Sequence, residues 1–176
     1  ENIANVLEIP HKVLNINTFK DLGENALTHA INVEQEPIEG ELPNTFVPGR
    51  NLIFLTYAAA YAYNQGINDI VAGVCQPDYS GYPDCRKNTI DALEKSISLG
   101  MDNEFKVHTP LMDLTKAETV KLMRKLGYYE LLQYTHTCYE GAKPACGKCP
   151  ACKLRLKGFQ EAGEKDPLQY QKHREA

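Results

Sequence analysis

The sequence predicts an α/β fold with an open, mostly parallel sheet, helices on both faces and a zinc knuckle near the C-terminal end. Helical and strand patterns alternate along the chain, as expected when helices connect parallel strands. Residues 67–75 hold a short apolar run, typical of a parallel strand buried on both faces. Four cysteines fall within the fifteen residues 138–152, which indicates metal ligation. We expect an α/β domain over residues 1–134 and a zinc-binding C-terminal region over residues 135–176, packed on the same domain.

The first part of the chain has weak patterns. Apolar residues at helical spacing predict a helix over residues 1–7, and residues 11–17 form a plausible short strand. Residues 18–31 are weakly helical. Residues 32–44 contain four glutamates, two prolines and a glycine, so we expect an acidic loop there.

The later elements follow clearer apolar patterns. Residues 51–64 are apolar almost all round, which predicts a fully buried helix at the centre of the core. The spacing then predicts a helix over residues 88–99 and a strand over residues 105–109. A capping box starts a further predicted helix over residues 115–126.

Net charge and hydropathy limit which partners the protein can bind and where in the cell it is expected. The net charge of −4 provides no positive field to hold nucleic acid or an anionic membrane. The most apolar stretch, residues 52–63, is twelve residues long, whereas a bilayer-spanning helix needs roughly 20. No secretory signal is visible at the start of the chain. We therefore expect a soluble, cytoplasmic protein that binds neither nucleic acid nor a membrane through its net charge.

The loop that follows the strand at 67–75 is a candidate binding site, because ligands of open parallel sheets bind beyond the carboxyl ends of the strands. Its tyrosine rings suit stacking on a flat heterocycle, its carboxylates accept hydrogen bonds and its guanidinium pairs with an anionic substituent. The alternative is an ordinary polar surface turn. The candidate substrate-binding residues in this loop are Asp78, Tyr82, Asp84 and Arg86.

Two helix starts supply further candidates. Arg50 and Asn51 follow a Pro-Gly turn at the start of the predicted buried helix, where free N–H groups attract anions. Alternatively, Asn51 only caps that helix. Lys116 lies at the first position of its helix, where the helix dipole disfavours a cation unless an anion is bound. A solvated lysine is the alternative.

The cysteine spacing is the most specific signal. Two overlapping C-x-x-C steps bring Cys146, Cys149 and Cys152 together, and Cys138 supplies a fourth thiolate. Four thiolates close the tetrahedral shell of Zn²⁺, so the site is expected to be structural. An iron–sulfur cluster is the main alternative, although in ferredoxins the fourth cysteine lies downstream of the other three. Four unrelated buried thiols are the remaining alternative.

Four stretches resemble the QueC family of queuosine biosynthesis, within the PP-loop ATP-pyrophosphatase group. They cover most of the chain in the family's order, and several are long and unusual. The stretches are LPNTFVPGRN (42–51), GVCQPDYSGYPDCR (73–86), HTPLMDLTKAE (108–118) and THTCYEGAKPACGKCPACKLR (135–155).

The resemblance implies an adenine nucleotide alpha hydrolase-like fold and a homodimer. It also implies an ATP-dependent ligase that converts 7-carboxy-7-deazaguanine and ammonia into 7-cyano-7-deazaguanine. Lys116, with Mg²⁺, would then stabilise charge that develops on phosphate. The family's zinc ligands fall on the cysteine quartet.

One departure concerns the family's amino-terminal Ser-Gly-Gly-x-Asp-Ser loop, which cradles the ATP phosphates and has no counterpart in the 176 residues. We therefore expect the chain to be part of a larger protein and to be inactive alone. Two other functions stay open, a tRNA-modifying PP-loop enzyme and a non-catalytic zinc-stapled binding module. The first would need a catalytic cysteine near Cys75 or Cys85 and a basic face.

Overall fold

The computed structural model describes residues 1–36, 38, 40–76 and 81–172, and the chain forms two compact units. We call residues 1–45 and 116–176 the knuckle unit, and residues 46–115 the sheet unit. Each of the three apolar clusters found among the described residues draws on one unit only. The predicted α/β class with a parallel sheet is confirmed, and the predicted domain boundary at residue 134 stays a prediction.

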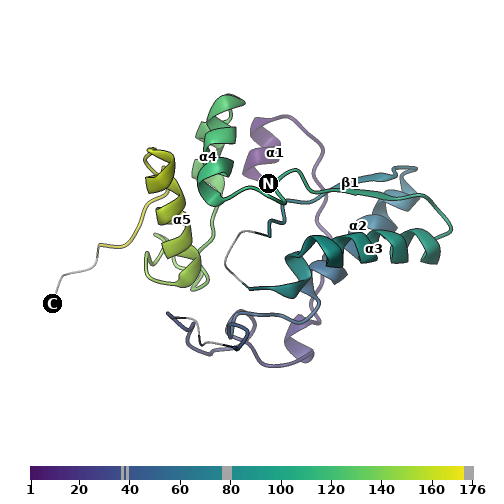
Figure 1. Cartoon of the computed structure of the whole chain (residues 1–176), viewed down its shortest axis with the longest axis horizontal. Helices are drawn as coiled ribbons and strands as arrows, with labels where there is room; N and C mark the ends of the chain where they lie inside the picture. Colours follow the sequence, from purple (N-terminus) through teal and green to yellow (C-terminus); the bar gives the residue numbers. More distant parts are fainter. Residues whose placement is uncertain (37, 39, 77–80, 173–176) are drawn as a thin grey trace. The chain divides into compact units, whose positions relative to one another are not determined.

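The sheet unit contains a two-stranded parallel sheet and two long helices (Figure 1). In chain order its elements are α2 (Arg50–Asn64), β1 (Asp69–Val71), the 3-10 turn η2 (Pro83–Cys85), α3 (Lys87–Gly100) and β2 (Lys106–His108). Ile70 pairs with Val107 in the parallel register. The predicted helices over 51–64 and 88–99 and the predicted strand over 105–109 are therefore confirmed.

One face of this sheet forms the core of the unit. Ile70 and Val107 are buried among the apolar residues of α2 and α3, which include Leu55, Ile90 and Ile97. Burying an aliphatic side chain of this size contributes about 1.5 to 3 kcal/mol. These few residues therefore hold both helices against the strands.

The prediction of complete burial for α2 and β1 is wrong. Val71 is 70% exposed, because it lies on the face of the sheet opposite Ile70. Phe54, Tyr57 and Tyr61 of α2 are also exposed. Since alanine occurs on both sides of α2 and apolar or aromatic residues also lie on its exposed side, hydropathy alone did not reveal which side faces the core.

The outer edge of β2 is closed by side chains from α3. Glu94 Oε2 accepts the Val107 N–H at 2.7 Å, and Ser98 Oγ accepts the Phe105 N–H at 3.1 Å. The hydrogen bond from Val107 outweighs the effect of burial and lowers the pKa of Glu94. An exposed strand edge can pair with another chain, and these two side chains occupy the donors that such pairing needs.

The knuckle unit consists of short helices and loops. Its elements are α1 (Asn2–Val6), the 3-10 turn η1 (Phe19–Asp21), α4 (Lys116–Lys125), the 3-10 helix η3 (Tyr129–Tyr134) and α5 (Pro150–Ala162). Helices α4 and α5 lie side by side (Figure 1). The predicted helices at 1–7 and 115–126 are confirmed, whereas the sequence patterns did not predict α5.

Two predictions in the first part of the chain are wrong. Residues 11–17 form no strand, and Val13 is 64% exposed. A strand needs a partner edge, which a few apolar residues alone do not supply. Residues 18–31 hold only η1 and turns, because Asn25 Oδ1 accepts the N–H groups of Leu27 and Thr28 in competition with a helix.

The predicted acidic loop at 32–44 is a loop in its described residues. Reciprocal hydrogen bonds hold its two ends together, as the Asn44 N–H donates to Glu34 Oε2 and the Glu34 N–H donates to Asn44 Oδ1. The loop therefore has a fixed base.

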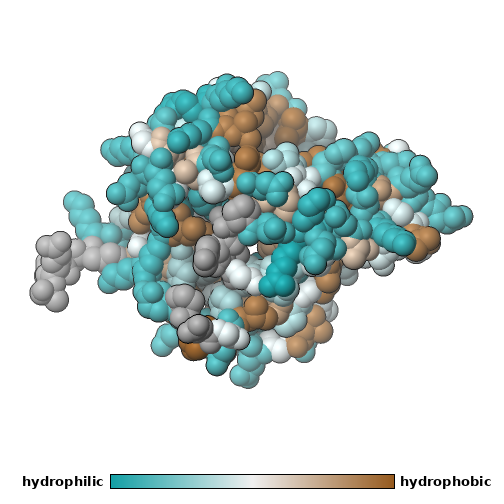
Figure 2. Space-filling view, viewed as in Figure 1, coloured by the Kyte–Doolittle hydropathy of each residue, from teal (hydrophilic) through white to brown (hydrophobic). Residues whose placement is uncertain are grey.

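Surface composition varies over the face drawn in Figure 2, where apolar side chains reach the surface between hydrophilic ones. Exposed apolar residues include Val6, Ile9 and Leu22. Each helix in the described part of the chain falls short of the length and apolarity that crossing a membrane requires.

Candidate metal centre and substrate-binding cluster

The four cysteines predicted as ligands converge on one point. The Sγ atoms of Cys138, Cys146, Cys149 and Cys152 all lie within 4.8 Å of one another, and all four residues are buried. Sulfurs bound to one zinc ion at about 2.3 Å lie about 3.8 Å apart at the corners of a tetrahedron. The Cys146 and Cys152 sulfurs are 3.9 Å apart. The quartet can therefore hold a single metal ion, and it leaves little room for a multi-iron cluster.

Backbone N–H groups point at these sulfurs. Cys146 Sγ accepts from the N–H groups of Lys148 and Cys149 at 3.4 and 3.3 Å. The Cys146 N–H donates to Cys138 Sγ, and the Tyr139 N–H donates to Cys149 Sγ. Such donors stabilise negative charge on sulfur, which a metal-bound thiolate carries. The loops around the quartet therefore favour the ligand form of the thiols.

Burial has the opposite effect on the Cys152 thiol, because it favours the neutral form. It raises the pKa of the Cys152 thiol, and the neighbouring Cys149 raises it further. A cation at the centre would reverse this effect, because metal coordination deprotonates a thiol.

The acidic loop covers the cysteine quartet within the knuckle unit. Val33 and Ala26 are buried in the same apolar cluster as the four cysteines. Lys153 of α5 donates to the Gln35 carbonyl at 3.1 Å and pairs with Glu36 at 2.5 Å. Ala26, Val33 and the segment 35–36 are thus held against the knuckle.

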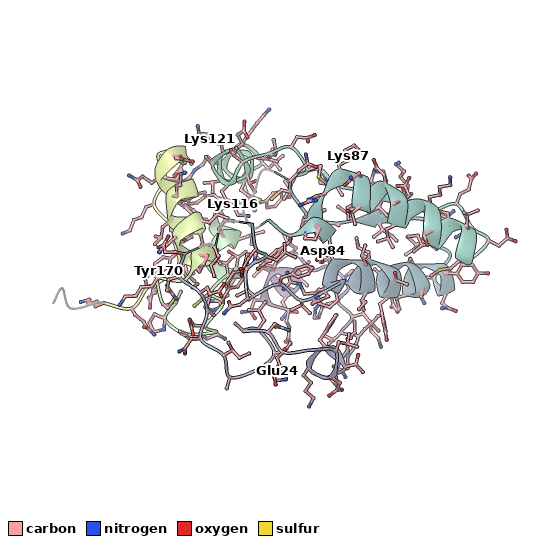
Figure 3. The ribbon with its side chains drawn as sticks, turned by 60° about the horizontal axis from the view of Figure 1, so that its bottom comes forward. Glu24, Asp84, Lys87, Lys116, Lys121 and Tyr170 are labelled. Carbon is pink, nitrogen blue, oxygen red and sulfur yellow. The ribbon has the colours of Figure 1, made fainter. Side chains whose placement is uncertain are left out.

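A second cluster lies in the sheet unit, at the start of α2. Asp84 is only 4% exposed, and its Oδ2 accepts the Asn51 N–H at 2.9 Å. Figure 3 shows Asp84 where the first turns of α2 and α3 come together. A carboxylate at this position complements the positive end of the helix dipole. Asp84 therefore anchors η2 to α2.

Aromatic and cationic groups surround this anchor. The Tyr82 ring is 6% exposed, stacks on Phe46 at 5.8 Å between centroids and lies 5.6 Å from the Arg50 guanidinium carbon. The Asn51 side chain donates to Cys85 Sγ at 3.2 Å. Asn51 is inside α2 and is not its cap, because Gly49 occupies the cap in the left-handed conformation.

The other candidate residues lie elsewhere. Arg86 is exposed at the residue before α3, and Lys116 is half-buried at the first residue of α4 in the knuckle unit. Asp78 lies outside the described residues. The structure thus brings Arg50, Asn51, Tyr82 and Asp84 together, and their roles toward a substrate stay predictions.

The sequence patterns missed two sets of neighbours. Phe46 and Cys85 belong to the cluster at the start of α2, although only their place in unusual motifs could have pointed to them. Arg155, Asp166 and Tyr170 form a buried network beside the cysteines. The position of Arg155, three residues after Cys152 on one helix face, was an available signal.

Comparisons with known proteins give the family. The family described as "Queuosine biosynthesis protein QueC" matches residues 1–163. A 7-cyano-7-deazaguanine synthase from Chromobacterium violaceum is 55% identical over 168 residues, covering 94% of this chain and 72% of the relative. The protein of the same name from Laribacter hongkongensis is 56% identical, covering 94% of this chain and 73% of the relative. The chain therefore belongs to the queuosine biosynthesis protein QueC family.

Proposed function

We propose that this chain is part of a ligase that makes 7-cyano-7-deazaguanine from 7-carboxy-7-deazaguanine and ammonia at the expense of ATP. The observation that carries the proposal is 55% identity over 168 residues to a protein named 7-cyano-7-deazaguanine synthase. The cluster at the start of α2 supports it, because Asp84 and Tyr82 hold this end of the helix and Arg50 there offers a guanidinium that suits an anionic substituent.

The chemistry requires two activations, first of the carboxylate of the substrate and then of the amide formed from it. The carboxylate oxygen attacks a phosphorus of ATP, and the remaining part of ATP leaves as the P–O bond breaks. Ammonia then displaces the activated oxygen, which departs with its phosphoryl group, and loss of one proton gives the amide. A second ATP activates the amide oxygen in the same way, and loss of two protons from nitrogen with departure of that phosphorylated oxygen gives the nitrile. Each activation places negative charge on phosphate, which accompanying Mg²⁺ and protein cations stabilise.

We assign roles to individual residues as follows. Arg50, Arg86 and Asp78 bind the deazaguanine substrate directly, the arginines through its carboxylate. The substrate site also depends on Asp84, Asn51 and Tyr82, which hold the start of α2 and so position Arg50. Lys116 stabilises the phosphate that leaves, so its charge matters most in the transition state.

We further propose that the cysteine quartet holds a structural zinc ion. Its four sulfurs leave no coordination position for a substrate, so zinc would fix the fold of the knuckle and take no part in the reaction. Metal analysis is expected to find one zinc per chain and no iron.

The decisive assay mixes 7-carboxy-7-deazaguanine, ATP, Mg²⁺ and ammonium with enzyme and detects the nitrile by mass spectrometry. It is run on a version extended upstream to include the family's phosphate loop, with the 176-residue chain for comparison. The extended version is expected to form nitrile only when ATP is present. Consumption of ATP without nitrile would contradict the proposed reaction.

A matched pair of variants tests Lys116. Lys116→Ala is expected to lower kcat more than it raises KM, because a transition-state interaction is lost. Lys121→Ala removes an exposed lysine from the same helix and is expected to leave both constants unchanged (Figure 3). Equal effects of the two variants would contradict the assignment.

Assembly and location are part of the same proposal. We propose a cytoplasmic homodimer that binds small molecules and no nucleic acid. Light scattering is expected to give twice the mass of one chain.

A further inference from the structure

A buried ion pair lies beside the cysteine quartet. Arg155 donates from Nε to Asp166 Oδ2 at 2.7 Å and from Nη2 to Asp166 Oδ1 at 2.9 Å. The two side chains are only 7% and 5% exposed. Arg155 follows the ligand Cys152 by three residues on α5, so both project from the same side of the helix.

The same guanidinium holds the segment that leads to Cys138. Its Nη1 donates to Thr135 Oγ1 at 2.6 Å, and its Nη2 donates to the Leu132 carbonyl at 3.2 Å. Arg155 therefore connects α5, which carries Cys152, to the segment 132–135, which leads to Cys138.

Asp166 extends the network to the tail of the chain. It accepts the Tyr170 hydroxyl at 2.6 Å and the Leu168 N–H at 2.9 Å. The tail also forms two backbone hydrogen bonds with Ala145, the residue before Cys146. The Ala145 N–H donates to the Gln169 carbonyl, and the Gln171 N–H donates to the Ala145 carbonyl. Ala145 is fully buried, and Tyr170 lies near α5 in Figure 3.

We propose that Arg155, Asp166 and Tyr170 are positioning residues that retain the metal at the cysteine quartet. They fix the three segments that carry Cys138, Cys146 and Cys152 without contacting the ion. Partners that orient metal ligands typically change metal affinity 10- to 100-fold when they are removed. A buried charge left without its partner is especially costly, so the network acts as one unit.

The knuckle unit contains a matched control. Arg124 and Glu164 form another two-point ion pair, with distances of 2.9 and 2.5 Å. Their side chains are 50% and 25% exposed, and α4 supplies the arginine. This pair resembles Arg155–Asp166 in chemistry and differs from it in burial.

The test measures zinc transfer from the zinc-loaded 176-residue chain to a chromogenic chelator. Asp166→Asn is expected to release zinc 10 to 100 times faster than the unchanged chain, and Tyr170→Phe a few times faster. Glu164→Gln is expected to stay within twofold. Val120→Ala weakens the separate cluster of Val120, Tyr129 and Phe159, so it is expected to lower thermal stability without accelerating zinc release.

Each outcome bears on the proposal. Tyr170→Phe keeps the ring and removes one hydrogen bond, so it decides the matter if Asp166→Asn does not fold. Release rates that follow thermal stability across all variants, including Val120→Ala, would reduce the network to a general structural role and overturn the proposal. Failure of the unchanged chain to bind zinc would overturn it as well, whereas loss of nitrile synthesis alone would affect only the proposed reaction.

Discussion

Asp84 illustrates how a single side chain links two parts of the sheet unit. Its carboxylate is buried and accepts the N–H of Asn51, a donor in the first turn of α2 that has no partner within the helix. The bond joins residues 33 apart in sequence. Asp84 thus determines where η2 and Tyr82 lie relative to Arg50.

Removing this carboxylate is expected to destabilise the protein. Asp84→Ala should lower the free energy of unfolding by about 1 to 3 kcal/mol, because a part-buried N–H loses its acceptor. Asp84→Asn should cost less, since its amide oxygen still accepts. Urea unfolding measures both, with the exposed Asp91→Asn on α3 as a control within about 0.5 kcal/mol. An unchanged midpoint for Asp84→Ala would contradict the anchoring role.

At this scale the sequence predicted the cysteine quartet in full and Asp84 only in part. The four cysteines lie close along the chain, so local spacing determines their convergence. Asp84 gains its role from a helix that starts 33 residues earlier, and no local pattern contains that information. The loop that contains Asp84 could be selected from its carboxylates, tyrosines and arginine. The hydrogen-bond partner of Asp84 could not be predicted.

Helices α4 and α5 approach each other closely at Gly158. A Cβ built on Gly158 would lie 2.4 Å from Lys116 Cβ, closer than packed atoms can stand. Gly158 therefore sits where α5 needs a residue without a side chain. The first residue of α4 is positioned by this contact.

Gly158→Ala is expected to destabilise the protein, although alanine normally favours a helix by about 0.5 to 1 kcal/mol. Overpacking costs about 1 to 3 kcal/mol, so the net change should be unfavourable. Gly100→Ala, at the end of α3, meets no atom within 4 Å and should be neutral or slightly stabilising. Thermal unfolding of both variants checks the prediction, which fails if they shift Tm in the same direction.

The outer edge of β2 gives a pH-dependent prediction. The pKa of Glu94 is lowered, so its contribution to stability is fully present above the ordinary value of about 4.3 and is lost as the pH falls through the lower folded-state pKa. Glu94→Gln removes this titration. Its stability deficit relative to the unchanged chain is therefore expected to be largest near neutral pH and to shrink below pH ~4.

Urea midpoints measured from pH 7 to pH 3 test this, and Asp91→Asn serves as the control from the same helix, since Asp91 is exposed. A Glu94→Gln deficit that stays constant over the whole range would show that the carboxylate charge does not matter.

Both the extent and the buried side of an element followed from the sequence where it has one strong apolar side. Helix α3 shows Ile90 and Ile97 on a single buried side, and its boundaries followed from that spacing. Residues 11–17 contain apolar residues but have no partner strand, and α2 has apolar residues on its exposed side. Whether a segment pairs as a strand, and which side of a helix faces the core, depend on tertiary neighbours. This explains why the strand at 11–17 and the complete burial of α2 were predicted wrongly.

In the whole molecule, the two units have separate cores. The sheet unit is held by apolar residues of α2, α3, β1 and β2, while the cysteine quartet is the centre of the largest cluster in the described part of the knuckle unit. Because a structural metal contributes to folding, removal of the zinc proposed for the quartet should act first on the knuckle unit.

Hydrogen exchange before and after zinc removal tests this division. Amides of residues 135–158 are expected to lose protection, and so are those of Ala26 and Val33, because both are buried against the cysteines. Amides of Ile70 and Val107 should keep their protection, since their core contains no residue of the knuckle. Equal loss of protection in both units would show that the metal stabilises the chain as one cooperative whole.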